Sequence, residues 1–170
     1  MKRIVQITVI VLITGFIFNG CENENPAGEG QLSGKVVKTS DCKDNLKSVG
    51  TPDNLSCVEY EFDQQNNLLK MEHINAGFNC CPKKLYCEVW QSNDTIYIQE
   101  FEEAALCRCN CLYDLDIEIK GVESQKYQVK FIEPYAEKQN KLIFEIDLNR
   151  KKTGKVCVKR NGYPWGMNSR

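Results

Sequence analysis

Beyond residue 33 the chain alternates between apolar and charged positions over short segments, and its apolar positions nowhere keep up a helical spacing. Tyr113, Leu115, Ile117 and Ile119, for example, alternate with acidic and basic side chains. A period of two is typical of strands with one buried face. The pattern predicts strands over residues 58–62, 69–73, 85–89, 96–98, 113–119, 127–131, 142–148 and 155–159.

Polar turn residues between these segments predict hairpins. Residues 64–67 separate the first two segments, and residues 92–94 separate the next two. Eight or nine short strands with one apolar face each must bury that face against a second layer. We therefore predict an all-β domain built as an antiparallel β-sandwich, with a small β-barrel as the alternative.

The first twenty residues have a different pattern. Lys2 and Arg3 precede an apolar stretch over residues 4–18, which is shorter than the roughly 20 residues that span a bilayer. This predicts a secretory signal peptide over residues 1–20. The stretch Phe18-Asn19-Gly20-Cys21 resembles the lipobox of bacterial lipoproteins, whose cysteine receives a lipid and becomes the first mature residue.

That resemblance implies a lipoprotein with acyl chains such as palmitate on Cys21. Its only implied partner is the membrane, and the protein would lie in the cell envelope, facing the periplasm or the cell exterior. The alternative is ordinary cleavage that leaves Cys21 as a free thiol. Residues 21–33 contain almost nothing to bury and predict a flexible tether after the lipidated cysteine. Residues 34–170 are then one domain.

Charge gives little further direction. The formal net charge is -1, and the acidic and basic residues are mostly mixed, so we expect no nucleic-acid partner. Basic residues crowd the last thirty positions, where a charged sheet edge is the simpler interpretation and an anionic-binding patch the alternative.

Cysteines are the most informative residues. Ten are present, and nine remain if Cys21 is acylated. In an exported chain this density predicts disulfides. The candidates for structural disulfides are Cys42, Cys57, Cys80, Cys81, Cys87, Cys107, Cys109 and Cys111, with Cys157 as the odd one.

The spacing of Cys107, Cys109 and Cys111 predicts an extended strand with three sulfurs on one face, turned toward the core. Residues two apart in a strand have Cα atoms about 6.6 Å apart, so these three are not expected to pair with one another. We expect them to face Cys80, Cys81 and Cys87, while Cys42 pairs with Cys57.

Two other roles for the sulfurs remain open. A thiolate site for zinc or copper would draw on Cys80, Cys81, Cys87, Cys107, Cys109 and Cys111. A thiol redox protein is the second alternative. The paired Cys-x-x-Cys spacing of common zinc sites is absent from the sequence, so we predict no metal and no cofactor.

Candidate catalytic residues are few. His73, the only histidine, shares a strand face with Leu69 and Met71, which favours a hydrogen-bonded core residue over a general base. Common catalytic motifs are absent from the sequence. The acidic run Asp114, Asp116 and Glu118 is interpreted as the solvated side of a strand and not as a calcium site. We predict no enzymatic activity.

The sequence Cys80-Cys81-Pro82, followed by Cys107-Arg108-Cys109-Asn110-Cys111, resembles uncharacterised lipoproteins of Bacteroidota-type bacteria. The resemblance covers about the central third of the chain and implies no particular activity. The sequence therefore predicts a non-enzymatic binding or structural module, anchored through Cys21 and stapled by disulfides.

Overall fold

The computed structural model of this protein describes residues 32–43, 50–103 and 107–166. The predicted signal peptide (1–20), Cys21 and residues 22–31 of the predicted tether lie outside the described residues. Within the described ranges there is no helix of the length and apolar character needed to cross a bilayer.

The described residues form nine strands. In chain order they are β1 (Ser33–Thr39), β2 (Leu55–Asp63), β3 (Leu68–Asn79), β4 (Leu85–Ser92), β5 (Thr95–Glu102), β6 (Asn110–Lys120), β7 (Lys126–Ile132), β8 (Ile143–Asp147) and β9 (Thr153–Lys159). Each of the eight predicted strand segments overlaps one of them, which confirms the interpretation of the alternating pattern.

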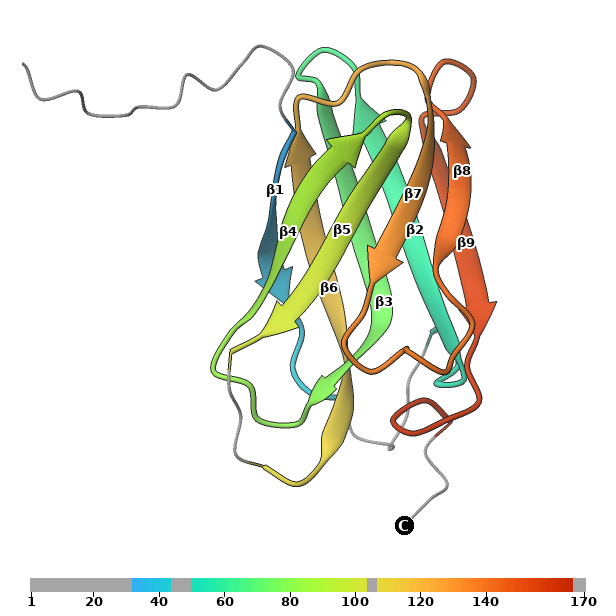
Figure 1. The fold of residues 1–170 in the computed structure, drawn as a ribbon. Coiled ribbons are helices and arrows are strands. Elements are labelled where there is room, and N and C mark those ends of the chain that lie inside the picture. The colour runs from blue at the N-terminus through green and yellow to red at the C-terminus, as the bar shows by residue number, and fades with distance from the viewer. Residues whose placement is uncertain (1–31, 44–49, 104–106, 167–170) are drawn as a thin grey trace, which may run out of the picture.

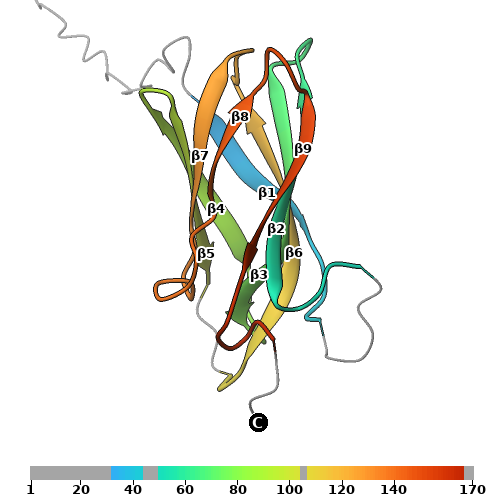
Figure 2. The same ribbon diagram turned by 90° about the vertical axis from the view of Figure 1, so that its right-hand side faces the viewer.

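The strands form two layers, as Figures 1 and 2 show. One sheet has five strands in the order β1-β6-β3-β2-β9, and the other has four in the order β4-β5-β7-β8. All paired neighbours are antiparallel except β5 and β7, which run parallel. The predicted β-sandwich is confirmed, and the sheets do not close into a barrel.

Strand β1 was not predicted. Its valines, Val36 and Val37, are adjacent, and the pairing of β1 with β6 shifts register between Val36 and Lys38. Such an irregularity breaks the period of two on which the prediction depends. The strand begins at Ser33, and Leu32 before it is already buried.

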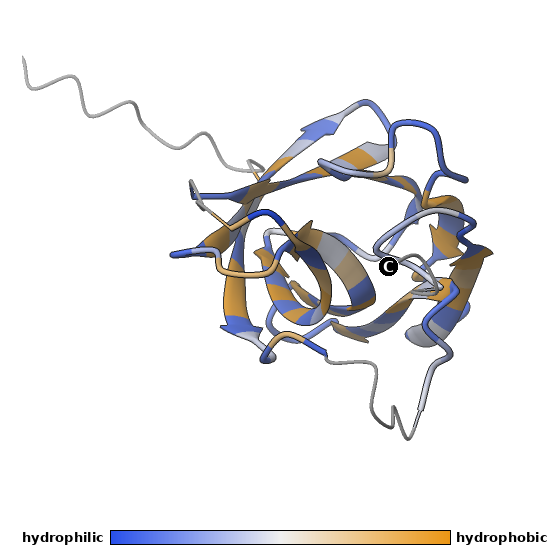
Figure 3. Ribbon diagram, turned by 90° about the horizontal axis from the view of Figure 1, so that it is seen from below, coloured by the Kyte–Doolittle hydropathy of each residue, from blue (hydrophilic) through white to orange (hydrophobic). Residues whose placement is uncertain are grey.

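The apolar sides of both sheets meet in one core. Inward-facing residues of the two layers include Leu69, Leu115 and Ile117 on one side and Ile96 and Val129 on the other, all 1% exposed or less. Burial of each such side chain contributes roughly 1.5–3 kcal/mol. Figure 3, which views the sandwich from below, shows hydrophobic and hydrophilic residues alternating along the strands.

Irregular backbone in β3 sets the position of its buried polar residues. The register with β6 shifts between His73 and Ala76, and Asn75 has a φ of 62°. Asparagine tolerates this left-handed conformation better than most residues. Its side-chain amide donates to the carbonyls of Pro52 and Leu55, which ties the bend to the start of β2.

Candidate functional site

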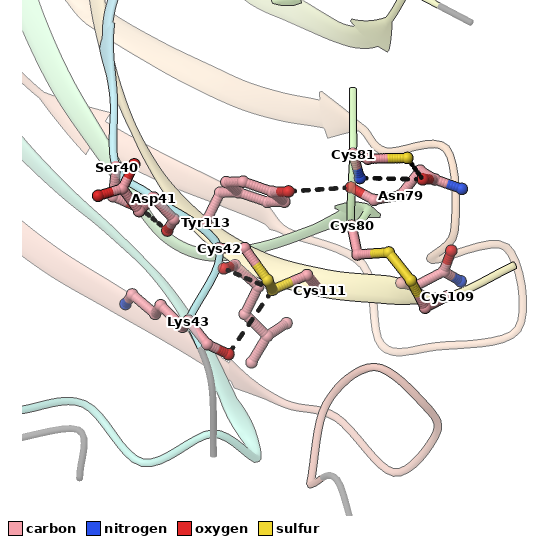
Figure 4. The surroundings of a disulfide bond; sticks show 12 residues. Ser40, Asp41, Cys42, Lys43, Asn79, Cys80, Cys81, Cys109, Cys111 and Tyr113 are labelled. Atoms are coloured by element: carbon pink, nitrogen blue, oxygen red, sulfur yellow. Dashed lines mark hydrogen bonds between the residues drawn. A yellow bond between two sulfur atoms is a disulfide. The ribbon is translucent and has the colours of Figure 1, made fainter. Parts of the chain in front are cut away.

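Four disulfides join eight of the nine cysteines that the structure describes. Cys80 pairs with Cys109 and Cys81 with Cys107, at one end of the sandwich. The other two bridges are Cys42–Cys111 and Cys57–Cys157, with Cα separations of 5.7 and 4.0 Å. Figure 4 shows the Cys42–Cys111 and Cys80–Cys109 bridges.

These pairs correct part of the expected connectivity. Cys80 and Cys81 do pair within the 107–111 segment, but the expected bridge between Cys42 and Cys57 is wrong. Cys157, expected to be left over, lies directly opposite Cys57 in the pairing of β2 with β9. Cys87 is the cysteine of the described residues that remains outside a disulfide.

The expected three-sulfur strand face is also wrong in part. Strand β6 begins only at Asn110, so Cys111 is inside the strand and buried at 2% exposure. Cys107 and Cys109 precede the strand and are exposed. Cys107 and Cys109 therefore do not continue the buried positions of β6, and they bond instead to Cys81 and Cys80 in the segment that follows β3.

All four bridges brace the five-stranded sheet. Cys57–Cys157 joins β2 to β9, and Cys42–Cys111 joins the segment after β1 to β6. The other two join the segment after β3 to the segment before β6. The sequence separations run from 26 to 100 residues. In the chain-entropy model, loops of this size contribute about 3 to 5 kcal/mol each, and less in sum because the loops overlap. The domain is therefore a disulfide-stapled β-sandwich.

We call Cys80, Cys81, Cys107 and Cys109 the cystine end. Asn79 organises it, because its side-chain oxygen accepts from the Cys81 N–H at 3.1 Å and its amide donates to the Cys107 carbonyl at 2.7 Å. The Cys80 N–H donates to the Cys109 carbonyl at 3.0 Å. The two bridges are thus held together by backbone and side-chain hydrogen bonds.

The cystine end also brings together sulfurs that suit a soft metal. The Sγ atoms of Cys80, Cys81 and Cys107 lie within 4.8 Å of one another, and Cys109 is bonded to Cys80. Reduction of both bridges would leave four thiols in one place, the number that a tetrahedral zinc site needs. Of the six cysteines proposed as ligands from the sequence, Cys87 and Cys111 are not part of this group.

Cys87 lies in the core of the four-stranded sheet, as its alternation with Leu85 and Val89 predicts. It is 8% exposed, and burial raises the pKa of its thiol to about 12, with a further contribution from the charge of Glu100. Nucleophilic attack requires the thiolate. Cys87 is therefore a poor redox reagent in the folded domain.

A second cluster, which we call the buried polar cluster, spans the gap between the two sheets. His73, Ser56 and Arg160 approach from the five-stranded side, and Glu100 and Glu133 approach from the four-stranded side. The His73 Nδ1 atom lies 2.7 Å from Glu100 Oε1, and Nε2 lies 2.9 Å from Ser56 Oγ. His73 is fully buried, which agrees with the predicted hydrogen-bonded core histidine.

Arg160 completes the charge balance of this cluster. Its Nη2 donates to both carboxylate oxygens of Glu133, each at 2.6 Å, and its guanidinium stacks on Trp165 at 4.9 Å. The charge of Arg160 and the proton held between His73 and Glu100 together offset the two carboxylates. Buried charges are tolerated when they are paired in this way.

The proton in the cluster belongs to the pair of His73 and Glu100. Burial alone would lower the pKa of His73, but the charge and hydrogen bond of Glu100, with the charge of Glu133, outweigh burial and raise it. Burial raises the pKa of Glu100, and His73 opposes this only in part. Both directions mean that the folded pair keeps its proton more firmly than the separate groups would in water.

Sequence reasoning missed four members of this cluster, although a signal was present. Each continues the inward alternation of its strand: Ser56 precedes Val58, Glu100 follows Ile98, Glu133 follows Phe131 and Arg160 follows Val158. A charged residue at an inward position predicts a buried partner of opposite charge, because buried charges need pairing. Two of their polar atoms, Glu100 Oε2 and Arg160 Nε, make no hydrogen bond to the described residues.

The remaining sequence candidates lie apart from both clusters. Asp114 forms an ion pair with Lys43 at 2.6 Å, and Asp116 lies 3.7 Å from Lys38. Glu118 faces Lys70 across the strand pair. Several of the C-terminal basic residues are also engaged, since Arg160 is buried and Lys155 pairs with Glu59.

Comparisons with known proteins add no relative. A scan against protein-family models, a search of curated proteins and a search of solved structures each find no match for this chain.

Proposed function

We propose that the protein is a lipid-anchored lipoprotein of the cell envelope whose disulfide-stapled β-sandwich is a non-enzymatic binding or structural module. The observation that carries the proposal is the set of four disulfides in the five-stranded sheet. Disulfides persist in oxidising compartments outside the cytoplasm. This agrees with the compartment that the signal pattern and Cys21 predict.

We propose a non-enzymatic module because a substrate cannot reach the histidine. His73, the only histidine in the sequence, is fully buried, and its ring nitrogens are directed at Glu100 and Ser56. A general base must reach its substrate within hydrogen-bond distance or through one water. The complete burial of His73 leaves a substrate no such approach, so we assign the cluster a role in stability.

The test is the chemical state of Cys21 in protein purified from membranes. The N-terminal peptide of the mature protein should begin at Cys21 and carry the mass of an acylated cysteine. The Cys21→Ala variant should lose that lipid and leave the membrane fraction. An unmodified Cys21 thiol, or a wild-type protein that fractionates as soluble, would refute the anchor.

A second candidate function is metal binding, favoured by the sulfur group at the cystine end. After reduction, the domain should bind one Zn²⁺ or Cu⁺ ion through Cys80, Cys81, Cys107 and Cys109. The variant Cys81→Ser/Cys107→Ser should then lose the ion, while Cys57→Ser/Cys157→Ser should keep it. Equal metal uptake by both variants would exclude this site.

A thiol redox function is supported less well. The free thiol of the described residues belongs to Cys87, which is buried and has a raised pKa.

A further inference from the structure

The outer faces of the two sheets differ in chemistry. On the five-stranded sheet, a row of charged residues crosses all five strands in register: Lys38, Asp116, Glu72, Glu59 and Lys155. The four-stranded sheet carries aromatic residues on its outer side instead. We call Tyr86 and Trp90 of β4, with Tyr97 and Phe101 of β5, the aromatic face.

The aromatic face consists of two stacked pairs. Tyr86 and Phe101 lie opposite each other with ring centroids 5.2 Å apart, and Trp90 and Tyr97 lie opposite each other at 5.1 Å. Trp90 is 38% exposed and Tyr86 is 36% exposed. A cluster of exposed aromatic side chains on a soluble domain marks an interaction surface.

A lysine lies over each pair. The Lys84 amine is 5.7 Å from the Tyr86 ring centroid, and the Lys130 amine is 5.6 Å from that of Tyr97. Lys130 of β7 lies opposite Tyr97, and exposed Ile143 of β8 lies opposite Lys130, so both extend the row of Trp90 and Tyr97 across the sheet. Aromatic rings, an aliphatic side chain and two ammonium groups therefore share this surface.

The aromatic face is next to the point where the chain enters the domain. Strand β1 lies beside β4, so closely that a Cβ on Gly34 would be 2.2 Å from a methyl carbon of Val89, the residue before Trp90. Figure 1 shows the start of β1 and the turn between β4 and β5 at the same end of the sandwich.

The number of residues between Cys21 and β1 limits how far the aromatic face can lie from a lipid on Cys21. Eleven residue steps separate Cys21 from Leu32. Even fully extended, they reach at most about 40 Å. A surface tethered this closely meets the bilayer at a high effective concentration, so weak individual contacts are sufficient.

We propose that the aromatic face rests on the phospholipid headgroup layer of the bilayer that holds the Cys21 lipid, an inference that depends on the proposed anchor. Trp and Tyr place their rings at the boundary between acyl chains and headgroups, and their N–H and O–H groups bond the polar layer. Lys84 and Lys130 complement the charge of lipid phosphates while their stems cover the rings. The charged face of the five-stranded sheet then points away from the membrane.

A glycan is the other occupant that such a face suits, because Glu88 and Gln99 pair between the two aromatic pairs and offer hydrogen bonds to hydroxyls. The position of the face beside the tethered strand favours the bilayer, and the experiment separates the two.

The test uses the full lipidated chain in vesicles of phosphatidylethanolamine and phosphatidylglycerol, with and without brominated phosphatidylcholine. Trp90 and Trp165 are the only tryptophans, and Trp165 is 1% exposed. Brominated lipid should quench most of the Trp90 emission, and the Trp90→Phe variant should show no quenching. The matched control is the double variant Trp90→Phe/Val37→Trp, which moves the tryptophan to the charged face. The Val37 side chain there is 45% exposed, and emission from a tryptophan at this site should also remain unquenched.

The outcomes separate the two proposals. A lipidated Cys21 peptide with unquenched Trp90, or equal quenching of the Val37→Trp control, overturns the orientation and leaves the anchor intact. Emission of Trp90 that ignores brominated lipid but shifts with maltohexaose or chitohexaose assigns the face to glycans and also overturns it. A Cys21 peptide without lipid overturns both proposals.

Discussion

Replacing Arg160 with Met removes one cation from the buried polar cluster while keeping most of the packing against Trp165. The loss leaves Glu133 without the two 2.6 Å hydrogen bonds that its carboxylate now accepts. Glu133 and Glu100 then have only the proton that His73 and Glu100 share to offset their charge in a buried site. We expect Arg160→Met to destabilise the domain strongly.

The magnitude follows from the cost of an uncompensated buried charge. Removing one partner of a buried ion pair costs about 3 to 5 kcal/mol, a large part of the roughly 5 to 15 kcal/mol that stabilises a typical domain. The double variant Arg160→Met/Glu133→Gln removes the charges of both partners. It should be more stable than Arg160→Met alone, because the surviving group no longer carries an unpaired charge.

The assay is urea unfolding at neutral pH with the disulfides intact, on wild type, both single variants and the double variant. The m-value should stay constant, so that the shift in midpoint reports stability. A loss below about 1 kcal/mol for Arg160→Met, or strictly additive losses in the double variant, would contradict the paired-charge description of the cluster.

Three further predictions concern the proton, one disulfide and the free thiol. Folded His73 has a pKa above its ordinary value of 6.5, so its contribution to stability is fully present below pH 6.5 and is lost as the pH rises through the raised pKa. The melting temperature should therefore fall from about pH 6 to pH 9. A flat profile, or the same slope in His73→Gln, would refute this assignment. The Cys57→Ser/Cys157→Ser variant opens a loop with a sequence separation of 100 residues, and its free energy of unfolding in chemical denaturation should fall by up to about 4.7 kcal/mol. An unchanged midpoint would count against a stabilising role for this disulfide. Cys87, with its pKa raised to about 12, should resist iodoacetamide until the domain unfolds, and rapid labelling of the native protein would contradict its burial.

The alternating pattern predicted most of the fold because one face of nearly every strand is buried. Val58, Tyr60 and Phe62 in β2 illustrate this, since all three are buried while Glu61 is exposed. Strand β1 escaped prediction because it is an edge strand with a register shift and mostly exposed side chains. The parallel pairing of β5 with β7 also could not be read from alternation, which is the same for either direction.

The candidate site was predicted only in part, for a related reason. Cysteine spacing indicated which segments meet at the cystine end, but partners such as Cys57 and Cys157 depend on which strands are neighbours in the sheet. The buried polar cluster likewise draws on five separate segments. Only the inward position of each charged residue was visible in the sequence, and the pairing required the fold.

The count of free thiols tests the central claim most directly. In the unfolded full chain, four disulfides and an acylated Cys21 leave one reactive thiol, that of Cys87, without reductant, and nine of the ten cysteines after reduction. We predict that result, with no zinc or copper in elemental analysis of the same sample. Most thiols reacting without reductant, together with stoichiometric metal, would contradict the stapled, lipid-anchored module.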